Sequence, residues 1–409
     1  MDSLTQLTLG AAVGEAVLGK KAGNRAMLWG AIGGTIPDLD VFANVATDEI
    51  SALAFHRAIT HSFAFAVIAP LIMGWAVHRL YAKRQFGPAL GLSALAIFSL
   101  VGLGSLGVPI PVTEIPKVAG AVTVAIMFFP AIVYGYRQLR KRDAWAGASR
   151  AQWSWLFFWS IFTHPLLDAC TTYGTQLFQP FADYRVAFNN ISVADPLYTM
   201  PFLLLVIAAL IAGRKRPRLR FWLNTSGLII SSAYLLFTFY NKVHVHRVFR
   251  ESLDRQEVVY HRFMTAPTIL NNLLWQGIAE GDTAFYHGMY SLLDEEERVT
   301  SFTVIPKNHD LLPPPPYSRD LETLMWFSDG YFSILPREAG GLQYNDLRFG
   351  SLKQSFDDPS DFVFHFVLEQ DEAGKWRARQ SREQPRDADQ ALRNLWNRMM
   401  GINNQEAKR

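Results

Sequence analysis

Aspartate and histidine residues gather in three short clusters, and each cluster stands at the edge of an apolar segment. An ionisable side chain at the centre of a membrane costs about 2.5–3.5 kcal/mol unless it is paired, so these positions need a physical reason. Imidazole nitrogens and carboxylate oxygens are donors that zinc and manganese accept, and no thiolate accompanies them. Six side chains are therefore candidate ligands of a divalent metal: Asp38, Asp40, His56, His61, His164 and Asp168.

The first two clusters leave simpler interpretations open. In the run Pro37–Asp40, both acids would serve equally well as caps in a turn. In the second cluster, His56 and His61 lie five residues apart and do not share one helical face, although a turn between them can direct both at one ion. An isolated pair of histidines at a membrane boundary is more often solvated or hydrogen-bonded than bound to a metal.

The third cluster places His164 and Asp168 four residues apart, on one face of a helix. An imidazole and a carboxylate in this arrangement can share a metal ion. A hydrogen bond between them, near a kink at Pro165, is the equal alternative. The case for a metal therefore depends on whether the three clusters meet.

Long apolar segments must position these clusters, because a membrane-spanning helix needs about 20 mostly apolar residues. A segment over 153–168 should kink at Pro165, and two shorter stretches, 4–18 and 26–36, carry glycines that permit close helix packing in lipid. Together with five further segments, these stretches predict an α-helical integral membrane bundle of about 6–8 membrane helices. The five segments, which come close to the required length, are 62–80, 88–108, 118–136, 196–212 and 221–240.

Basic residues predict the orientation of this bundle. Lys and Arg concentrate after the segments 62–80, 118–136 and 196–212, within 79–84, 137–150 and 214–220. By the positive-inside rule these loops are cytoplasmic, which places the alternate ends of the helices outside. None of the candidate ligands enters this argument, yet all three clusters fall at the same outer boundary. We therefore expect them to converge on one metal, or on a bridged pair of metals.

Composition changes near residue 241. The chain of 409 residues is 50% hydrophobic and 18% charged, but charged residues are spread evenly only in its last part. Alternation over 361–366 and an apolar run over 299–305 predict strands, and 387–400 predicts a helix. The sequence thus predicts a membrane-embedded domain, 1–245, and a small soluble α+β domain, 246–409, on the extracytoplasmic side.

Charge and cysteine content exclude several classes of protein. A formal net charge of +3 is too small to indicate a nucleic-acid partner. The single cysteine, Cys170, excludes an internal disulfide and a cysteine-rich zinc module. The expected partners are membrane lipid and a small-molecule or lipid substrate.

The motifs together resemble the bacterial membrane-bound metal-dependent hydrolases, inner-membrane proteins described as LexA-regulated and distantly similar to zinc-dependent phospholipase C. The resemblance rests on Pro37–Asp40, His56–Ser62 and Thr163–Asp168 with the following Thr172–Thr175, and covers about the first 200 residues. It implies a metal-dependent hydrolase with these Asp and His residues as ligands. One departure is Gln6, in a region where many relatives carry a histidine.

The expected function is hydrolysis of a lipid-derived or phosphoester substrate at the outer face of the bacterial inner membrane. Zinc is the first choice of metal and manganese the second. Asp38 or Asp168 would take a proton from water, and Arg57 would bind an anionic ester group. A simpler role for Arg57 is an anchor among lipid headgroups.

Two alternatives remain open for the whole chain. One is a metal-binding or transport protein whose Asp and His residues form a path rather than a reaction centre, and the other is an assembly factor with a structural metal. Ionisable groups at one boundary favour a site over a path. Glu15 is either a partner of a ligating histidine or an ion-pair partner of Lys20 or Lys21.

Overall fold

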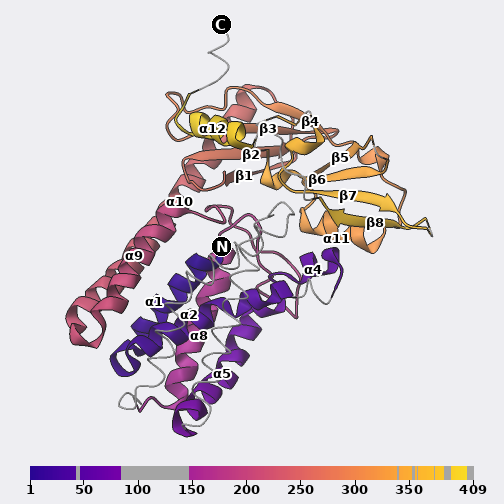
Figure 1. Ribbon diagram of the computed structural model, residues 1–409. Coiled ribbons are helices and arrows are strands. Elements are labelled where there is room, and N and C mark those ends of the chain that lie inside the picture. The colour runs from indigo at the N-terminus through magenta and orange to yellow at the C-terminus, as the bar shows by residue number, and fades with distance from the viewer. Residues whose placement is uncertain are drawn as a thin grey trace. The chain divides into compact units, whose positions relative to one another are not determined.

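The chain divides into two compact units, which are described in turn (Figure 1). The first comprises Met1–Ala46, Phe55–Phe188 and Pro196–Leu236, and the second comprises Thr47–Ala54, Asn189–Asp195 and Phe237–Arg409. Two of the predicted membrane segments, 88–108 and 118–136, lie outside the described residues. The computed structural model describes residues 1–42, 47–83, 147–338, 340–351, 355–356, 358–372, 374–381 and 388–402.

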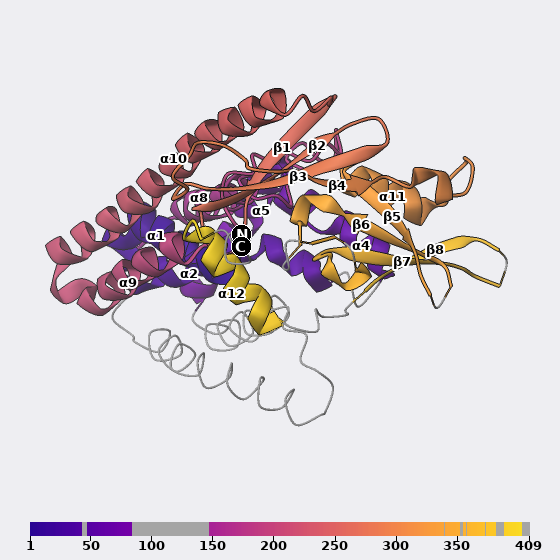
Figure 2. The ribbon, with the colours of Figure 1, turned by 90° about the horizontal axis from the view of Figure 1, so that it is seen from above.

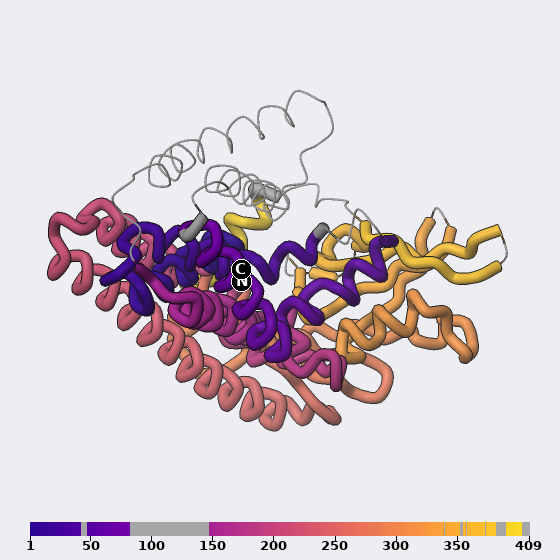
Figure 3. Tube along the Cα trace, turned by 90° about the horizontal axis from the view of Figure 1, so that it is seen from below, coloured from indigo at the N-terminus to yellow at the C-terminus, as the bar shows by residue number. Residues whose placement is uncertain are grey.

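The first unit is helical. Its helices α1, α2, α5 and α8 pack side by side in Figure 1, and Figure 3 shows the same group from below. Helix α1 starts at Asp2, whose side chain accepts from the Thr5 amide, and α8 starts at Ser149 with a reciprocal cap from Gln152. The long helices are α1 (Ser3–Ala22), α2 (Asn24–Thr35), α5 (Phe63–Lys83), α8 (Arg150–Asp168), α9 (Pro196–Ala212) and α10 (Pro217–Arg255), of which α10 continues into the second unit from Phe237.

Three helical stretches among the described residues are long and apolar enough to cross a membrane: Phe63–Tyr81, Pro196–Lys215 and Pro217–Arg255. They correspond to three of the predicted segments and are fewer than the 6–8 expected, so a helical region with apolar spans is confirmed but the larger number is not. Helix α2, with 12 residues, is too short to span a bilayer. Helix α8 continues through Pro165 for three more residues instead of breaking there.

Glycines bring α1 and α2 into backbone contact. A Cβ atom added at Gly14 would lie 2.2 Å from the carbonyl oxygen of Ala26, and one added at Gly30 would lie 2.2 Å from that of Gly10. At Gly34 it would lie 2.7 Å from the carbonyl oxygen of Gln6. The predicted role of these glycines in close packing is therefore confirmed.

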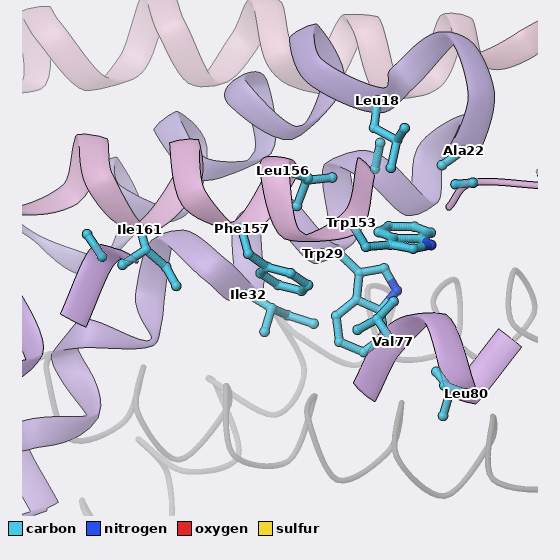
Figure 4. Packing of buried hydrophobic residues seen from close by; sticks show 13 residues of the cluster. Leu18, Ala22, Trp29, Ile32, Val77, Leu80, Trp153, Leu156, Phe157 and Ile161 are labelled. Carbon is cyan, nitrogen blue, oxygen red and sulfur yellow. The ribbon is translucent and has the colours of Figure 1, made fainter. Parts of the chain in front are cut away.

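Aromatic residues fill the space between α2, α5 and α8 (Figure 4). The rings of Trp29 and Phe157 meet edge to face with centroids 6.1 Å apart, and the Trp29 indole donates a 2.8 Å hydrogen bond to the Tyr81 hydroxyl. A Cβ at Gly33 would lie 2.3 Å from the Ser160 hydroxyl oxygen. This packing holds the middle of α8 against α2.

The second unit contains two antiparallel sheets, each a meander in which neighbouring strands follow one another in sequence (Figure 2). A β-sheet-containing C-terminal domain with helices is therefore confirmed. The first sheet consists of β1 (Arg262–Pro267), β2 (Leu274–Glu280), β3 (Ala284–Ser291) and β4 (Thr303–Pro306). The second consists of β5 (Phe332–Pro336), β6 (Leu342–Asp346), β7 (His365–Gln370) and β8 (Trp376–Gln380).

Helices cover the apolar faces of these sheets. On the first sheet, Val245 and Phe249 of α10 pack with Trp275 of β2. On the second, Ile50 of α4 (Glu49–Phe55) packs with Leu321 of α11 (Arg319–Phe327). The helix predicted over 387–400 is α12 (Ala388–Met399).

Both predicted strands are displaced toward the C-terminus. The run 299–305 yields β4 from Thr303, and 361–366 contains the start of β7 at His365. Within the second run, Asp361 ends the 3₁₀ turn η6 (Pro359–Asp361), and Phe362 pairs only through an isolated bridge with Ser351. The alternation of residue types over 361–366 indicated which side chains are buried, but the first residues of this run belong to a turn and not to the strand.

Replacing Gly14 by valine should destabilise the helical unit, because the new side chain meets the Ala26 carbonyl oxygen. We expect a loss of about 1–3 kcal/mol. Thermal unfolding in detergent measures this as a lower midpoint temperature. Ala16→Val, at an exposed position of the same helix, is the control and should unfold like the unchanged chain. Equal midpoints for Gly14→Val and Ala16→Val would contradict the close contact.

Candidate metal centre

Four side chains from three segments meet in the first unit: Asp38, His61, His164 and Asp168. Asp38 lies in the 3₁₀ turn η1 (Pro37–Phe42) after α2, His61 ends η2 (Ile59–His61) before α5, and the other two lie in the last turns of α8. All four residues are buried, and each directs one ligand atom to a point where these atoms lie within 4.8 Å of one another. The structure thus joins members of all three clusters.

The ligand atoms are spaced as a metal ion requires. The two imidazole Nε2 atoms, of His61 and His164, are 3.0 Å apart. Asp38 Oδ1 lies 3.5 and 3.4 Å from them, and Asp168 Oδ2 lies 3.3 Å from each. Zinc bonds to N and O ligands measure about 2.0–2.1 Å, so the edges of a tetrahedron around the ion are about 3.3 Å. The four side chains therefore fit a divalent ion.

The second nitrogen of each imidazole is also bound. His164 Nδ1 lies 2.5 Å from the Gly34 carbonyl oxygen, a partner that can only accept, so Nδ1 carries the proton and Nε2 is left for an ion. His61 Nδ1 lies 3.3 Å from Asp40 Oδ2 and 3.1 Å from the Thr60 hydroxyl oxygen. Both rings are thereby oriented with Nε2 toward the centre.

Asp40 and His56 do not belong to this group of four. Asp40 Oδ1 lies 2.8 Å from His56 Nδ1, and Asp40 Oδ2 accepts a 2.8 Å hydrogen bond from the Arg57 amide and one from Thr60. The Asp40 carboxylate therefore binds protein donors on the far side of His61 from the metal centre. The His56 side chain is 30% exposed, so it lies at the rim rather than among the buried ligand atoms.

Arg57 lies beside Asp168 and does not extend toward solvent. Its side chain is 5% exposed, with Nε 3.3 Å from Asp168 Oδ2. Its Nη1 donates a 2.9 Å hydrogen bond to the Thr171 hydroxyl, and the guanidinium lies 4.9 Å from the centre of the Tyr173 ring. The backbone of Arg57 has a φ of +60°, a left-handed conformation that turns the chain between the two histidines.

Gln6 takes part in the site through Asp168. Its amide nitrogen donates to Asp168 Oδ1 at 3.0 Å and to the His164 carbonyl oxygen at 3.1 Å. The amino group of Met1 also contacts Asp168 Oδ1. Because Oδ1 is engaged in this way, Asp168 Oδ2 faces the imidazoles. The only sequence signal for this role was the departure from histidine at this position.

Glu15 lies elsewhere, since Arg220 of α10 forms an ion pair with it. Neither expected role, as partner of a ligating histidine or of Lys20 or Lys21, explains its position. The pairing joins α1 to α10 across more than 200 residues of sequence. A partner so distant in sequence cannot be found from local spacing.

The charges of the group call for a cation. Burial alone would raise the pKa of Asp38, but the imidazoles of His164 and His61 lower it well below its ordinary range. Burial alone would lower the pKa of His61, but the carboxylates of Asp168, Asp38 and Asp40 raise it to about 10. The acids are therefore stable as anions only beside positive charge, which imidazolium protons or a metal ion can supply.

Unused oxygen atoms complete the fit. Among the described residues, Asp38 Oδ2 and Asp168 Oδ2 are buried without a hydrogen-bond donor of suitable geometry. A buried carboxylate oxygen without a donor is costly unless a cation binds it. For Asp168, whose Oδ2 is the atom that faces both imidazoles, this observation and the spacing of the ligand atoms agree on a metal site.

Comparison with known proteins gives one result. A family model described as YdjM inner membrane protein matches residues 1–106 and 121–245, which is more than half of the chain and includes all six candidate ligands. No curated protein and no solved structure matches the chain. The match ends before the sheets of the second unit begin.

The two histidines before α5 provide a matched test of the site. We expect His61→Ala to lower bound divalent metal at least about tenfold, since a ligand is lost, whereas His56→Ala should retain it. Elemental analysis of purified protein, after exposure to zinc and removal of excess ion, measures the metal per chain. Equal losses in both variants, or a normal content in His61→Ala, would contradict the assignment.

Proposed function

The chain belongs to the YdjM inner membrane protein family, and from its buried Asp and His residues we propose that it is a membrane-bound metal-dependent hydrolase. The observation that carries the proposal is the convergence of buried ligand atoms from Asp38, His61, His164 and Asp168, in which each imidazole Nε2 lies 3.0–3.5 Å from the other three atoms. Zinc is the proposed ion and manganese the second choice, since the donor set contains nitrogen and oxygen but no sulfur. A divalent ion held there supplies a Lewis acid that polarises a phosphoryl or carbonyl oxygen and makes water more acidic.

Asp38 is the proposed proton acceptor. Its Oδ1 faces the imidazoles, while Oδ2 has no donor among the described residues. Its side chain is 10% exposed, whereas those of His61, His164 and Asp168 are fully buried. Substrate and water therefore reach the site most directly past Asp38, and its unused oxygen can accept a proton there.

Asp168 and Arg57 have a supporting role in this proposal. Gln6 donates to one oxygen of Asp168, and Arg57 pairs with the other. The guanidinium of Arg57 also favours an anionic ester near the ion. We therefore place Arg57 as a positioning residue that also favours a phosphoester over a neutral ester.

Exposed aromatic residues support a lipid-derived substrate. The loop after Asp168 presents Phe178, Phe181, Tyr184 and Phe188, with Phe181 88% exposed. Aromatic side chains of this kind concentrate at membrane–water interfaces. Arg185 of the same loop donates to the Tyr173 carbonyl oxygen, which joins the loop to the rim of the site. The proposed substrate is a phosphoester of lipid origin.

A metal-binding or transport function without hydrolysis is the alternative. It is favoured by one observation: the four side chains would already supply four protein ligands, as in structural zinc sites, whereas catalytic zinc sites keep one position open. The hydrolase proposal therefore requires that a bound ion would still be reached by water, on the side of Asp38. Assay of activity together with metal content separates the two functions.

We infer that the metal centre faces the extracytoplasmic side, together with the soluble domain 246–409, in a bundle of about 6–8 membrane helices. Support comes from α1, which carries Gln6 near its start and Lys20 and Lys21 in its last turn. The basic loop Gly213–Lys215 follows α9. Positive charges and the metal centre thus belong to opposite ends of α1.

Cysteine labelling tests this orientation, because Cys170 is buried. We expect Tyr184→Cys to react with a membrane-impermeant maleimide in cells with a permeabilised outer membrane. Lys215→Cys should react only after the inner membrane is broken, since the basic loop is cytoplasmic. Tyr184 and Lys215 are both exposed on the chain, so accessibility to the reagent is the only difference. The reverse pattern of labelling would invert the proposed topology.

Hydrolysis is tested on purified protein loaded with zinc or manganese, using phosphatidylglycerol, a phosphodiester, a phosphomonoester and an acyl ester. We expect phosphoester turnover, and an Asp38→Asn rate lower by about 10²–10⁴ because the proton acceptor is removed. Asp183→Asn, at an exposed position of the aromatic loop, is the control and should keep full activity. If the protein binds metal stoichiometrically but turnover of all four substrates stays at background, the hydrolase proposal is wrong and the metal-binding alternative is favoured.

A further inference from the structure

A second candidate site lies in the first unit, at the opposite end of α1 from the metal centre. A cavity of about 1050 Å³ opens between the last turn of α1, the loop after α9 and the first turns of α10. Gly19 and Gly213, which lack side chains, form part of its wall. From Gln6 to Gly19 the helix rises roughly 20 Å, so this cavity is separate from the metal centre.

One ion pair forms the inner end of the cavity. Arg220 is 4% exposed, pairs with Glu15 and also donates to the side chain of Asn24. The negative charge of Glu15 is therefore compensated by Arg220 within the protein. Asn224, which donates a 3.0 Å hydrogen bond to the Ala12 carbonyl oxygen, holds α10 against α1 at this level.

The rest of the lining is positively charged. The cavity is lined by five basic residues and one acid, which leaves a surplus of four positive charges. Four of the basic residues are exposed at its mouth: Lys20, Lys21, Arg214 and Arg218. A concave surface with this surplus raises the local concentration of anions. Phosphate groups are the anions that Lys and Arg bind best in such a pocket.

Apolar surface adjoins the charges. Phe221 and Trp222 also line the cavity, and they are 49% and 63% exposed. They stand near the start of α10, a candidate membrane span, so their rings lie where acyl chains meet headgroups. A soluble anion would use the basic residues alone, whereas a lipid would use both the charges and the rings.

We propose that this cavity binds the phosphate-bearing headgroup of an anionic membrane lipid. The phosphate lies among Lys20, Lys21 and Arg218, and the first part of an acyl chain lies along Trp222. Basic cavities between membrane helices on the cytoplasmic side are suited to such headgroups. The site is independent of the metal centre and of hydrolysis, because no residue is shared between them.

Two double variants separate this cavity from general surface charge. Lys21→Gln/Arg218→Gln removes one lysine and one arginine from the lining, and Lys215→Gln/Arg216→Gln removes the same pair of residue types from the same basic region outside the lining. All four residues are exposed, so both variants should fold, and circular dichroism on heating checks this. Native mass spectrometry of the delipidated full chain in neutral detergent then measures binding of phosphatidylglycerol, phosphatidylcholine and glycerol 1-phosphate.

Phosphatidylglycerol should bind the unchanged chain saturably and at least about tenfold more tightly than phosphatidylcholine. Each basic side chain contributes about fivefold to the binding of an anionic lipid, so the lining variant should bind about 25-fold more weakly, whereas binding to the control variant should be unchanged. Equal weakening in both variants would overturn the site in favour of dispersed charge. Glycerol 1-phosphate binding as tightly as the lipid would overturn the lipid source and identify a soluble phosphoester, and the absence of a preference for phosphatidylglycerol would overturn the proposal altogether.

Discussion

Two buried carboxylates face two buried imidazoles at distances of 3.3–3.5 Å. In a medium of low dielectric constant, charge on the acids has to be matched by positive charge nearby, and removing one partner leaves the other exposed to the full cost of desolvation. Protons on the imidazoles satisfy this requirement in part. A divalent cation satisfies it more completely, since it also gives Asp168 Oδ2, which faces both imidazoles without a well-aligned donor, a partner.

The surrounding helices hold these groups in register. The Gly34 carbonyl oxygen of α2 accepts a hydrogen bond from His164, and Gln6 of α1 donates one to Asp168. Both hydrogen bonds depend on the contact between α1 and α2, where glycine backbones meet without side chains between them. Packing and ligand geometry are thus parts of one arrangement, because a change in helix separation would move donors on both sides of the centre.

Much of the candidate site could be predicted from the sequence, and its limits have physical causes. The orientation of the basic loops predicted that three distant clusters would meet, and members of all three do. Spacing did not distinguish Asp38 from Asp40, because a 3₁₀ turn sends them in different directions, one to the centre and one behind His61. The contribution of Gln6 was not predictable either, since it depends on packing between α1 and α8. In the second unit, alternation identified strand-forming regions but not the turn that delays β7 until His365.

The two units are interleaved along the chain. The segment Thr47–Ala54 belongs to the second unit, although Asp38 and His61 of the metal centre precede and follow it. Within that unit Ile50 is 1% exposed and packs with Leu321, and the Glu49 carboxylate accepts from the Gln380 amide. Cutting the chain near residue 245 would therefore leave the segment Thr47–Ala54 on the membrane half without its packing partners. The other half would lose Ile50 from its hydrophobic core. The halves are separate in composition but not dissectable by a single break.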